Sequence, residues 1–106
     1  MGIFDLLKPQ DINEGVKTFQ GTAGARLLDV REPNEYASGH IPGSVNLPLS
    51  QIAAASALIP DRETPLFVYC LSGGRSSSAV GALERMGYTQ VHNIGGIRAW
   101  RGEIER

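Results

Sequence analysis

Hydrophobic and polar positions along the chain alternate between short apolar runs and helical spacings. The clearest strand is the continuous aromatic and β-branched run at 66–69, which is typical of a central parallel strand covered on both faces. Shorter apolar runs predict four more strands, near 5–7, 27–30, 45–47 and 91–94. Apolar positions repeating every three or four residues predict three helices, over 12–19, 52–58 and 76–86. This alternation predicts an α/β fold, with a roughly five-stranded, mainly parallel sheet flanked by helices on both faces.

Polar residues, glycines and prolines mark where these elements begin and end. Ser50 is expected to cap the second helix, and Pro60 to stop it. Ser76 is expected to start the third helix, and Gly87 to end it. The glycine pair at 95–96 predicts a turn after the last strand, followed by a final helical turn.

Composition narrows the class of protein without naming a function. The 106 residues are enough for one domain, spanning 1–106, and 42% of them are hydrophobic. Ten basic residues against eleven acidic ones give a net charge of -1, with no run of like charge, so no nucleic acid or membrane partner is predicted. No apolar run approaches the roughly 18 residues of a membrane span, and the first residues do not resemble a secretory signal. We therefore predict a cytoplasmic protein.

The single cysteine, Cys70, restricts the possible chemistry. It has no partner in the chain for a disulfide and no second cysteine for a cysteine-rich metal site. The two histidines, His40 and His92, lack ligand-like neighbours at short spacing, so no metal site is predicted. Any sulfur or redox chemistry at Cys70 must finish on a second molecule.

The most informative segment follows the central strand and precedes the third helix. In open α/β sheets, ligands bind outside the carboxyl ends of the strands. A tight, glycine-rich loop at that edge turns its backbone N–H groups inward, and the helix adds its positive end, so the loop is expected to cradle an anion. The candidate catalytic residue is Cys70, and the candidate substrate-binding residues are Leu71, Ser72, Gly73, Gly74, Arg75 and Ser76.

Two interpretations of Cys70 are possible from the residues alone. A lone cysteine after an apolar strand is most often an inert core residue. A cysteine beside a helix start and a cation has a lowered pKa and reacts as a thiolate. The adjacent Gly73, Gly74 and Arg75 favour the reactive thiolate, and Arg75 is expected to hold an anionic substrate through two hydrogen bonds.

Three stretches together resemble the rhodanese (sulfurtransferase) family, in its stand-alone single-domain form. They are the Cys-x-x-x-x-Arg-Ser loop at 70–76, the segment 28–48 with Asp29-Val30-Arg31 near its start, and the segment 91–100. The resemblance implies that Cys70 takes the outer sulfur of thiosulfate or a related donor as a persulfide, and passes it to a thiol acceptor. It also implies that the loop N–H groups stabilise the persulfide, that no cofactor is needed, and that kinetics are ping-pong.

The resemblance leaves the neighbouring polar residues with smaller roles. Asp29 and Arg31 follow a strand that neighbours the loop, and either could face the pocket. In the family this stretch is mainly structural, so both are predicted to support the loop through polar contacts. Glu32 and Glu35 are expected to be solvated or to cap a helix, not to act as catalytic acids.

Two features of the loop bear on its substrate. Related phosphatases have one more residue between cysteine and arginine, and the four residues here favour sulfur over a tetrahedral phosphate. Family members that use thiosulfate often have an additional basic residue in the loop, whereas Arg75 is the only one here. The alternatives are therefore an enzyme that turns over a small donor, a persulfide-carrier module with little turnover on free thiosulfate, and a non-catalytic interaction domain.

Overall fold

The computed structural model describes residues 11–106, so the strand expected near 5–7 lies outside the described residues. Within them, four parallel strands form one sheet, with the bounds β1 (Arg26–Asp29), β2 (Ser44–Asn46), β3 (Leu66–Cys70) and β4 (Val91–Gly96). The strand order is β2-β1-β3-β4. The predicted α/β fold is confirmed, with four strands in this part of the chain where about five were expected.

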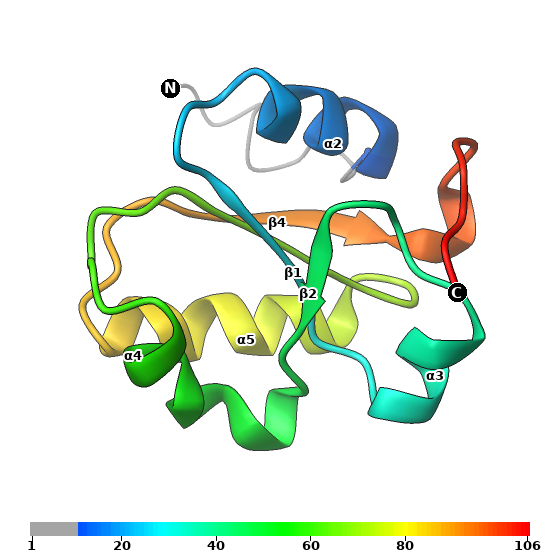
Figure 1. Ribbon diagram of the computed structural model, residues 1–106. Helices are drawn as coiled ribbons and strands as arrows, with labels where there is room; N and C mark the ends of the chain where they lie inside the picture. Colours follow the sequence, from blue (N-terminus) through cyan, green and yellow to red (C-terminus); the bar gives the residue numbers. More distant parts are fainter. Residues whose placement is uncertain (1–10) are drawn as a thin grey trace.

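Helices cover both faces of the sheet, as predicted. Figure 1 shows α2 (Ile12–Gln20) over one face, and α4 (Ala55–Leu58) and α5 (Gly74–Arg85) over the other. The remaining elements are the short helix α3 (Pro33–Ser38) and the 3-10 helices η1 (Leu49–Ala54) and η2 (Ile97–Ala99). No helix within 11–106 is long and apolar enough to cross a membrane.

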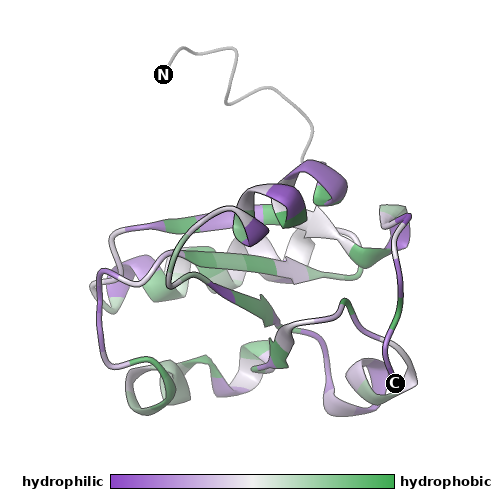
Figure 2. Ribbon diagram, turned by 45° about the horizontal axis from the view of Figure 1, so that its top comes forward, coloured by the Kyte–Doolittle hydropathy of each residue, from purple (hydrophilic) through white to green (hydrophobic). Residues whose placement is uncertain are grey.

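The strand β3 joins two hydrophobic clusters, because successive side chains of a strand point to opposite faces. Phe67 and Tyr69 pack with α2, and Leu66, Val68 and Cys70 pack with α4 and α5. All five residues of β3 are buried, and Figure 2 shows the apolar colouring along the sheet beneath the polar outer side of α2. Full burial of one large apolar side chain stabilises a fold by roughly 1.5–3 kcal/mol. The cysteine is therefore the last residue of a strand that is buried along its whole length.

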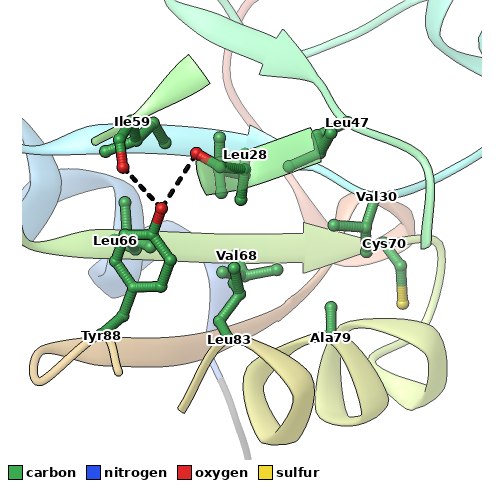
Figure 3. Close-up of a cluster of buried hydrophobic side chains, with 11 residues drawn as sticks. Leu28, Val30, Leu47, Ile59, Leu66, Val68, Cys70, Ala79, Leu83 and Tyr88 are labelled. Atoms are coloured by element: carbon green, nitrogen blue, oxygen red, sulfur yellow. Dashed lines mark hydrogen bonds between the residues drawn. The ribbon is translucent and has the colours of Figure 1, made fainter. Parts of the chain in front are cut away.

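The cluster between the sheet and α5 has a polar contact at one end and Cys70 at the other (Figure 3). At the far end, the buried Tyr88 hydroxyl lies within hydrogen-bond distance of the backbone carbonyls of Ala55 and Ile59. At the near end, Cys70 lies beside Val30 and Ala79, at the point where β3 stops. The sulfur is thus at the boundary between the apolar core and the loop that follows.

Three expected element boundaries are wrong. Ser50 does not cap a helix, because η1 begins at Leu49 directly after Pro48, with no side-chain cap. The third helix begins at Gly74 instead of Ser76, because Gly73 adopts φ +107° as the residue before it. The glycine pair 95–96 is not a turn, since it forms the last two residues of β4.

The strand β4 contains one extra residue relative to β3. Val68 pairs with Asn93, whereas Tyr69 pairs with Gly95, so Ile94 is left between two regular pairs. Such a β-bulge often uses a glycine with positive φ, and Gly95 has φ +104°. The bulge brings Gly96 level with Cys70, at the edge where the carboxyl ends of all four strands meet.

Candidate active site

The loop after β3 curls around the sulfur of Cys70. The backbone N–H of Gly73 donates to Cys70 Sγ across 3.0 Å. The Ser76 hydroxyl lies 3.4 Å from the same sulfur, within the first turn of α5. Gly73 reaches its left-handed conformation at little cost because it lacks a side chain. The predicted cradle of donors is present, at the start of a twelve-residue helix.

These contacts favour the ionised form of Cys70. Burial by itself raises the pKa of the thiol, because it disfavours the charged form. Hydrogen bonds from the Ser76 hydroxyl and from the backbone N–H groups of Ser76, Gly73 and Ser72 act in the opposite direction and outweigh burial. The pKa of Cys70 is therefore lower than that of an ordinary thiol. Cys70 is 1% exposed, as expected of an inert core residue, but the inert-core interpretation does not account for the donors around its sulfur.

Asn93 of β4 fixes the loop from outside, and the sequence did not identify it. Its side-chain N–H donates to the Gly73 carbonyl (3.2 Å), and its Oδ1 atom accepts from the Ser76 hydroxyl (2.8 Å) and from the Gly95 N–H (3.0 Å). One amide therefore holds the loop, the first turn of α5 and the bulge. The only sequence signal was a polar amide inside a predicted strand, two positions before a glycine pair.

The backbone of β4 touches the backbone of the loop. A Cβ atom at Gly96 would lie 2.1 Å from the Leu71 carbonyl oxygen and 2.5 Å from the Ser72 Cα atom. The N–H of Arg98 donates to the same Leu71 carbonyl across 3.1 Å. Only a residue without a side chain allows this approach, so Gly96 shapes the first half of the cradle.

Arg75 is paired with Glu35 and does not point freely into the cradle, so its contact with a substrate stays a prediction. Its Nη1 and Nη2 atoms donate to the two carboxylate oxygens of Glu35 on α3, at 2.7 and 3.1 Å. The hydrogen bond from Arg75, aided by one from the Glu32 N–H, lowers the pKa of Glu35 to about 2. The predicted capping role is confirmed, because Glu32 and Glu35 form a capping box at the start of α3.

Asp29 and Arg31 form a buried ion pair behind the site. Arg31 Nη2 lies 2.7 Å from Asp29 Oδ2, and Arg31 Nε is 3.0 Å from both carboxylate oxygens. Arg31 Nη2 also donates to the Gly39 carbonyl across 2.7 Å. Among residues 11–106, no hydrogen bond joins this pair directly to the loop at 70–76. Its contacts instead fix the segments on either side of α3, which carries Glu35.

An open pocket of about 530 Å³ lies next to the loop, on the side of β4 and η2. It is lined by Leu71, Ser72, Gly73, Ser77, Asn93, Gly95, Gly96, Arg98 and Ala99. Leu71 is half-buried and Ser72 is exposed, so the outer side of the loop is accessible from this pocket.

Residues 11–106 contain no group of three or more His, Cys, Asp or Glu side chains placed to hold a metal ion. His40 instead makes a structural contact with the Tyr36 carbonyl, as expected.

The sequence model of the family described as rhodanese-like domain matches residues 13–103, which is most of the chain. The chain belongs to the rhodanese-like family. It is 38% identical over 77 residues to the thiosulfate sulfurtransferase PspE of Escherichia coli, covering 72% of this chain and 74% of that protein. It is 41% identical over 86 residues to the uncharacterised protein YqhL of Bacillus subtilis, covering 80% and 68%.

Two solved structures of proteins from this family are also similar to this chain. The structure described as a rhodanese with anions from E. coli superposes with a TM-score of 0.72 at 32% identity, covering 77% of this chain and 98% of that one. The human single-domain sulfurtransferase TSTD1 superposes with a TM-score of 0.70 at 33% identity, covering 82% and 89%. The resemblance to single-domain rhodanese-like proteins is therefore confirmed.

Proposed function

We propose that this rhodanese-like protein is a sulfurtransferase that carries a sulfane sulfur as a persulfide on Cys70. The sulfur comes from thiosulfate or from a persulfide donor and passes to a thiol acceptor. The observation that carries the proposal is the set of donors around Cys70 Sγ, namely the Gly73 N–H, the Ser76 hydroxyl and the N–H groups of Ser72 and Ser76. A loop that stabilises a thiolate also suits the negative charge of a persulfide.

The first half-reaction moves electron pairs only between sulfur atoms. The Cys70 thiolate attacks the outer sulfur of thiosulfate, a new S–S bond forms, and the original S–S bond breaks. Sulfite leaves with that electron pair, and the outer sulfur of the new persulfide carries the negative charge. In the second half-reaction an acceptor thiolate attacks this outer sulfur and releases the Cys70 thiolate. The covalent intermediate makes the kinetics ping-pong, with no cofactor required.

The burial of Cys70 supports donors with a terminal sulfur. Only 1% of the residue is exposed, so little of its surface is open to a bulky reagent. The outer sulfur of thiosulfate and the terminal sulfur of a persulfide are both single atoms at the end of a molecule. Relatives named thiosulfate sulfurtransferase, such as PspE, support the same substrate class.

A second candidate is a persulfide-carrier module with little turnover on free thiosulfate. The pairing of Arg75 with Glu35 favours it, because the loop then has no unpaired cation for the thiosulfate dianion. The two candidates share the Cys70 persulfide and differ in donor. In the carrier, the donor is a persulfide on another protein or on a small thiol.

Intact-protein mass spectrometry tests both candidates. The reduced protein is mixed with thiosulfate and, separately, with a small-molecule persulfide, beside the variant Cys70→Ser. A gain of one sulfur atom that is absent in Cys70→Ser and reversed by cyanide supports the proposal. Loading by thiosulfate at a rate that sustains many turnovers favours the enzyme, and loading only by the persulfide favours the carrier. No gain from either donor would reject both and leave the interaction domain.

A further inference from the structure

The ion pair between Arg75 and Glu35 offsets the positive charge that Arg75 brings to the loop. Apart from the Cys70 thiolate, Arg75 is the only charged residue in the segment 70–76, and Glu35 is provided by α3, forty positions earlier in the chain. Both side chains are partly exposed, at 36% and 28%, so the pair lies near the surface. The position of Glu35 is set independently, because its Oε1 atom also accepts the Glu32 N–H across 2.8 Å.

This pairing removes net charge while leaving hydrogen-bond donors. A guanidinium has five N–H donors, and the two contacts with Glu35 use one on each terminal nitrogen. The remaining three have no protein acceptor within residues 11–106. Glu35, and to a smaller degree the charge of Cys70, raise the pKa of Arg75, so the guanidinium and the sulfur interact electrostatically. The site therefore offers donors to a substrate but little net positive charge.

Building on the function proposed above, we propose that Glu35 is a specificity-determining residue that sets the preferred charge of the sulfur donor. By neutralising Arg75, it disfavours a dianion such as thiosulfate relative to singly charged or uncharged sulfane donors. Persulfides and thiosulfonates belong to the favoured class, because they have at most one negative charge next to the transferable sulfur.

The expected size follows from Coulomb's law in a hydrated site. One charge about 6 Å from an anion changes its affinity roughly threefold for each unit of anion charge. Removing the Glu35 charge should therefore favour a monoanion about threefold and a dianion about tenfold. The selectivity between the two donors should change by about threefold.

The substitution Glu35→Gln removes this charge and retains an oxygen that can accept the Glu32 N–H. Glu63→Gln is the matched control, because it removes one charge from an exposed side chain before β3, at the opposite end of that strand from Cys70. Both variants change the net charge of the protein by the same amount. A change seen only in Glu35→Gln is then local to the loop.

The first readout does not depend on sulfur transfer. Cys70 is alkylated with iodoacetate, an anion, and with iodoacetamide, which is neutral. Both reagents consume the thiolate, so the ratio of their rates cancels any change in the pKa of Cys70. We expect the iodoacetate-to-iodoacetamide ratio to rise about threefold in Glu35→Gln and to stay unchanged in Glu63→Gln.

A charge cycle separates this effect from a misfolded loop. Arg75→Gln leaves Glu35 negative, so the alkylation ratio should fall about threefold below that of the natural protein. The double variant with both substitutions restores a neutral pair and should return the ratio to its natural value. A ratio that stays altered in the double variant would mean that loop distortion, not charge, is responsible, and would overturn the proposal.

The second readout compares two donors in the mass-spectrometric loading assay. Thiosulfate is a dianion that releases sulfite, and methanethiosulfonate is a monoanion that releases methanesulfinate by the same sulfur transfer. In Glu35→Gln, loading should rise about tenfold for thiosulfate and about threefold for methanethiosulfonate. Equal gains for the two donors would overturn the assignment of Glu35 as a charge filter, as would an unchanged alkylation ratio. A raised alkylation ratio without loading by either donor would support the effect of Glu35 on anions and reject the proposed sulfur transfer.

Discussion

The Ser76 hydroxyl lies 3.4 Å from the sulfur of Cys70, although the two residues stand at opposite ends of the loop 70–76. The same oxygen is 2.8 Å from Asn93 Oδ1 and 3.0 Å from the Gly73 carbonyl oxygen. A hydroxyl has one proton to donate, so these three acceptors compete for it. Ionisation of Cys70 strengthens the sulfur as an acceptor and shifts the proton towards it.

Replacing Ser76 by alanine should therefore raise the pKa of Cys70. Burial of the thiol is unchanged, while one of the hydrogen bonds that outweigh it is lost. The pH dependence of Cys70 alkylation by iodoacetamide should shift its midpoint to higher pH, with slower reaction below that midpoint. Ser78→Ala, at an exposed position of α5, is the control. In Ser76→Ala the free energy of unfolding should fall by about 1 kcal/mol, because a buried hydrogen bond is lost. An unchanged midpoint would show that Ser76 does not donate to the thiolate.

Gly96→Ala should distort the loop. The new methyl group would lie 2.1 Å from the Leu71 carbonyl oxygen, and the backbone on both sides has to move. Overpacking of this kind costs about 1–3 kcal/mol, and sulfur loading of Cys70 should slow with it. Gly81→Ala, inside α5, should instead stabilise the fold by about 0.5–1 kcal/mol. Urea unfolding and the loading assay measure both effects. Equal stability of the two variants would contradict the close approach of β4.

Asp29→Ala should be strongly destabilising, because it leaves the guanidinium of Arg31 buried without its partner. Breaking a buried ion pair by removing one side costs about 3–5 kcal/mol. Replacing both residues with apolar ones of similar volume should cost much less. Urea unfolding of the single and double variants makes the comparison. A loss below about 1 kcal/mol in the single variant would show that the pair is dispensable.

The Arg75–Glu35 pair should contribute to stability only above acidic pH. The pKa of Glu35 is about 2 in the folded protein, against an ordinary value of 4.5. A lowered pKa stabilises the fold above the ordinary value, and this contribution is lost as pH falls from 4.5 towards 2. The unfolding free energy of Glu35→Gln should be about 0.5–1 kcal/mol below that of the natural protein near neutral pH, after allowing for solvent screening. The difference should shrink in acid, and a difference that is constant with pH would contradict the ion pair.

The sequence predicted the parts of the site that are local in the chain. Cys70 and the glycine-rich loop follow a strongly apolar strand, so their position at the edge of the sheet could be read from the pattern. The partners of Arg75 and Ser76 could not, because Glu35 and Asn93 come from distant segments and no local signal pairs them. The capping role of Glu35 was recognised, yet its second contact depends on where α3 packs beside the loop. The turn expected at 95–96 failed for a related reason, since pairing with β3 keeps those glycines in a strand.

The glycine pair at the end of β4 has a consequence for chirality. Gly95 has φ +104°, a conformation that an L-residue resists and a D-residue accepts. Gly96 has an ordinary extended backbone, with φ −132°, and excludes an L-side chain because the loop occupies that space. The two neighbours are therefore not equivalent. D-alanine introduced at 95 by chemical synthesis should be compatible with the φ of the bulge, whereas an L-side chain at 96 has an allowed φ but meets the backbone of the loop.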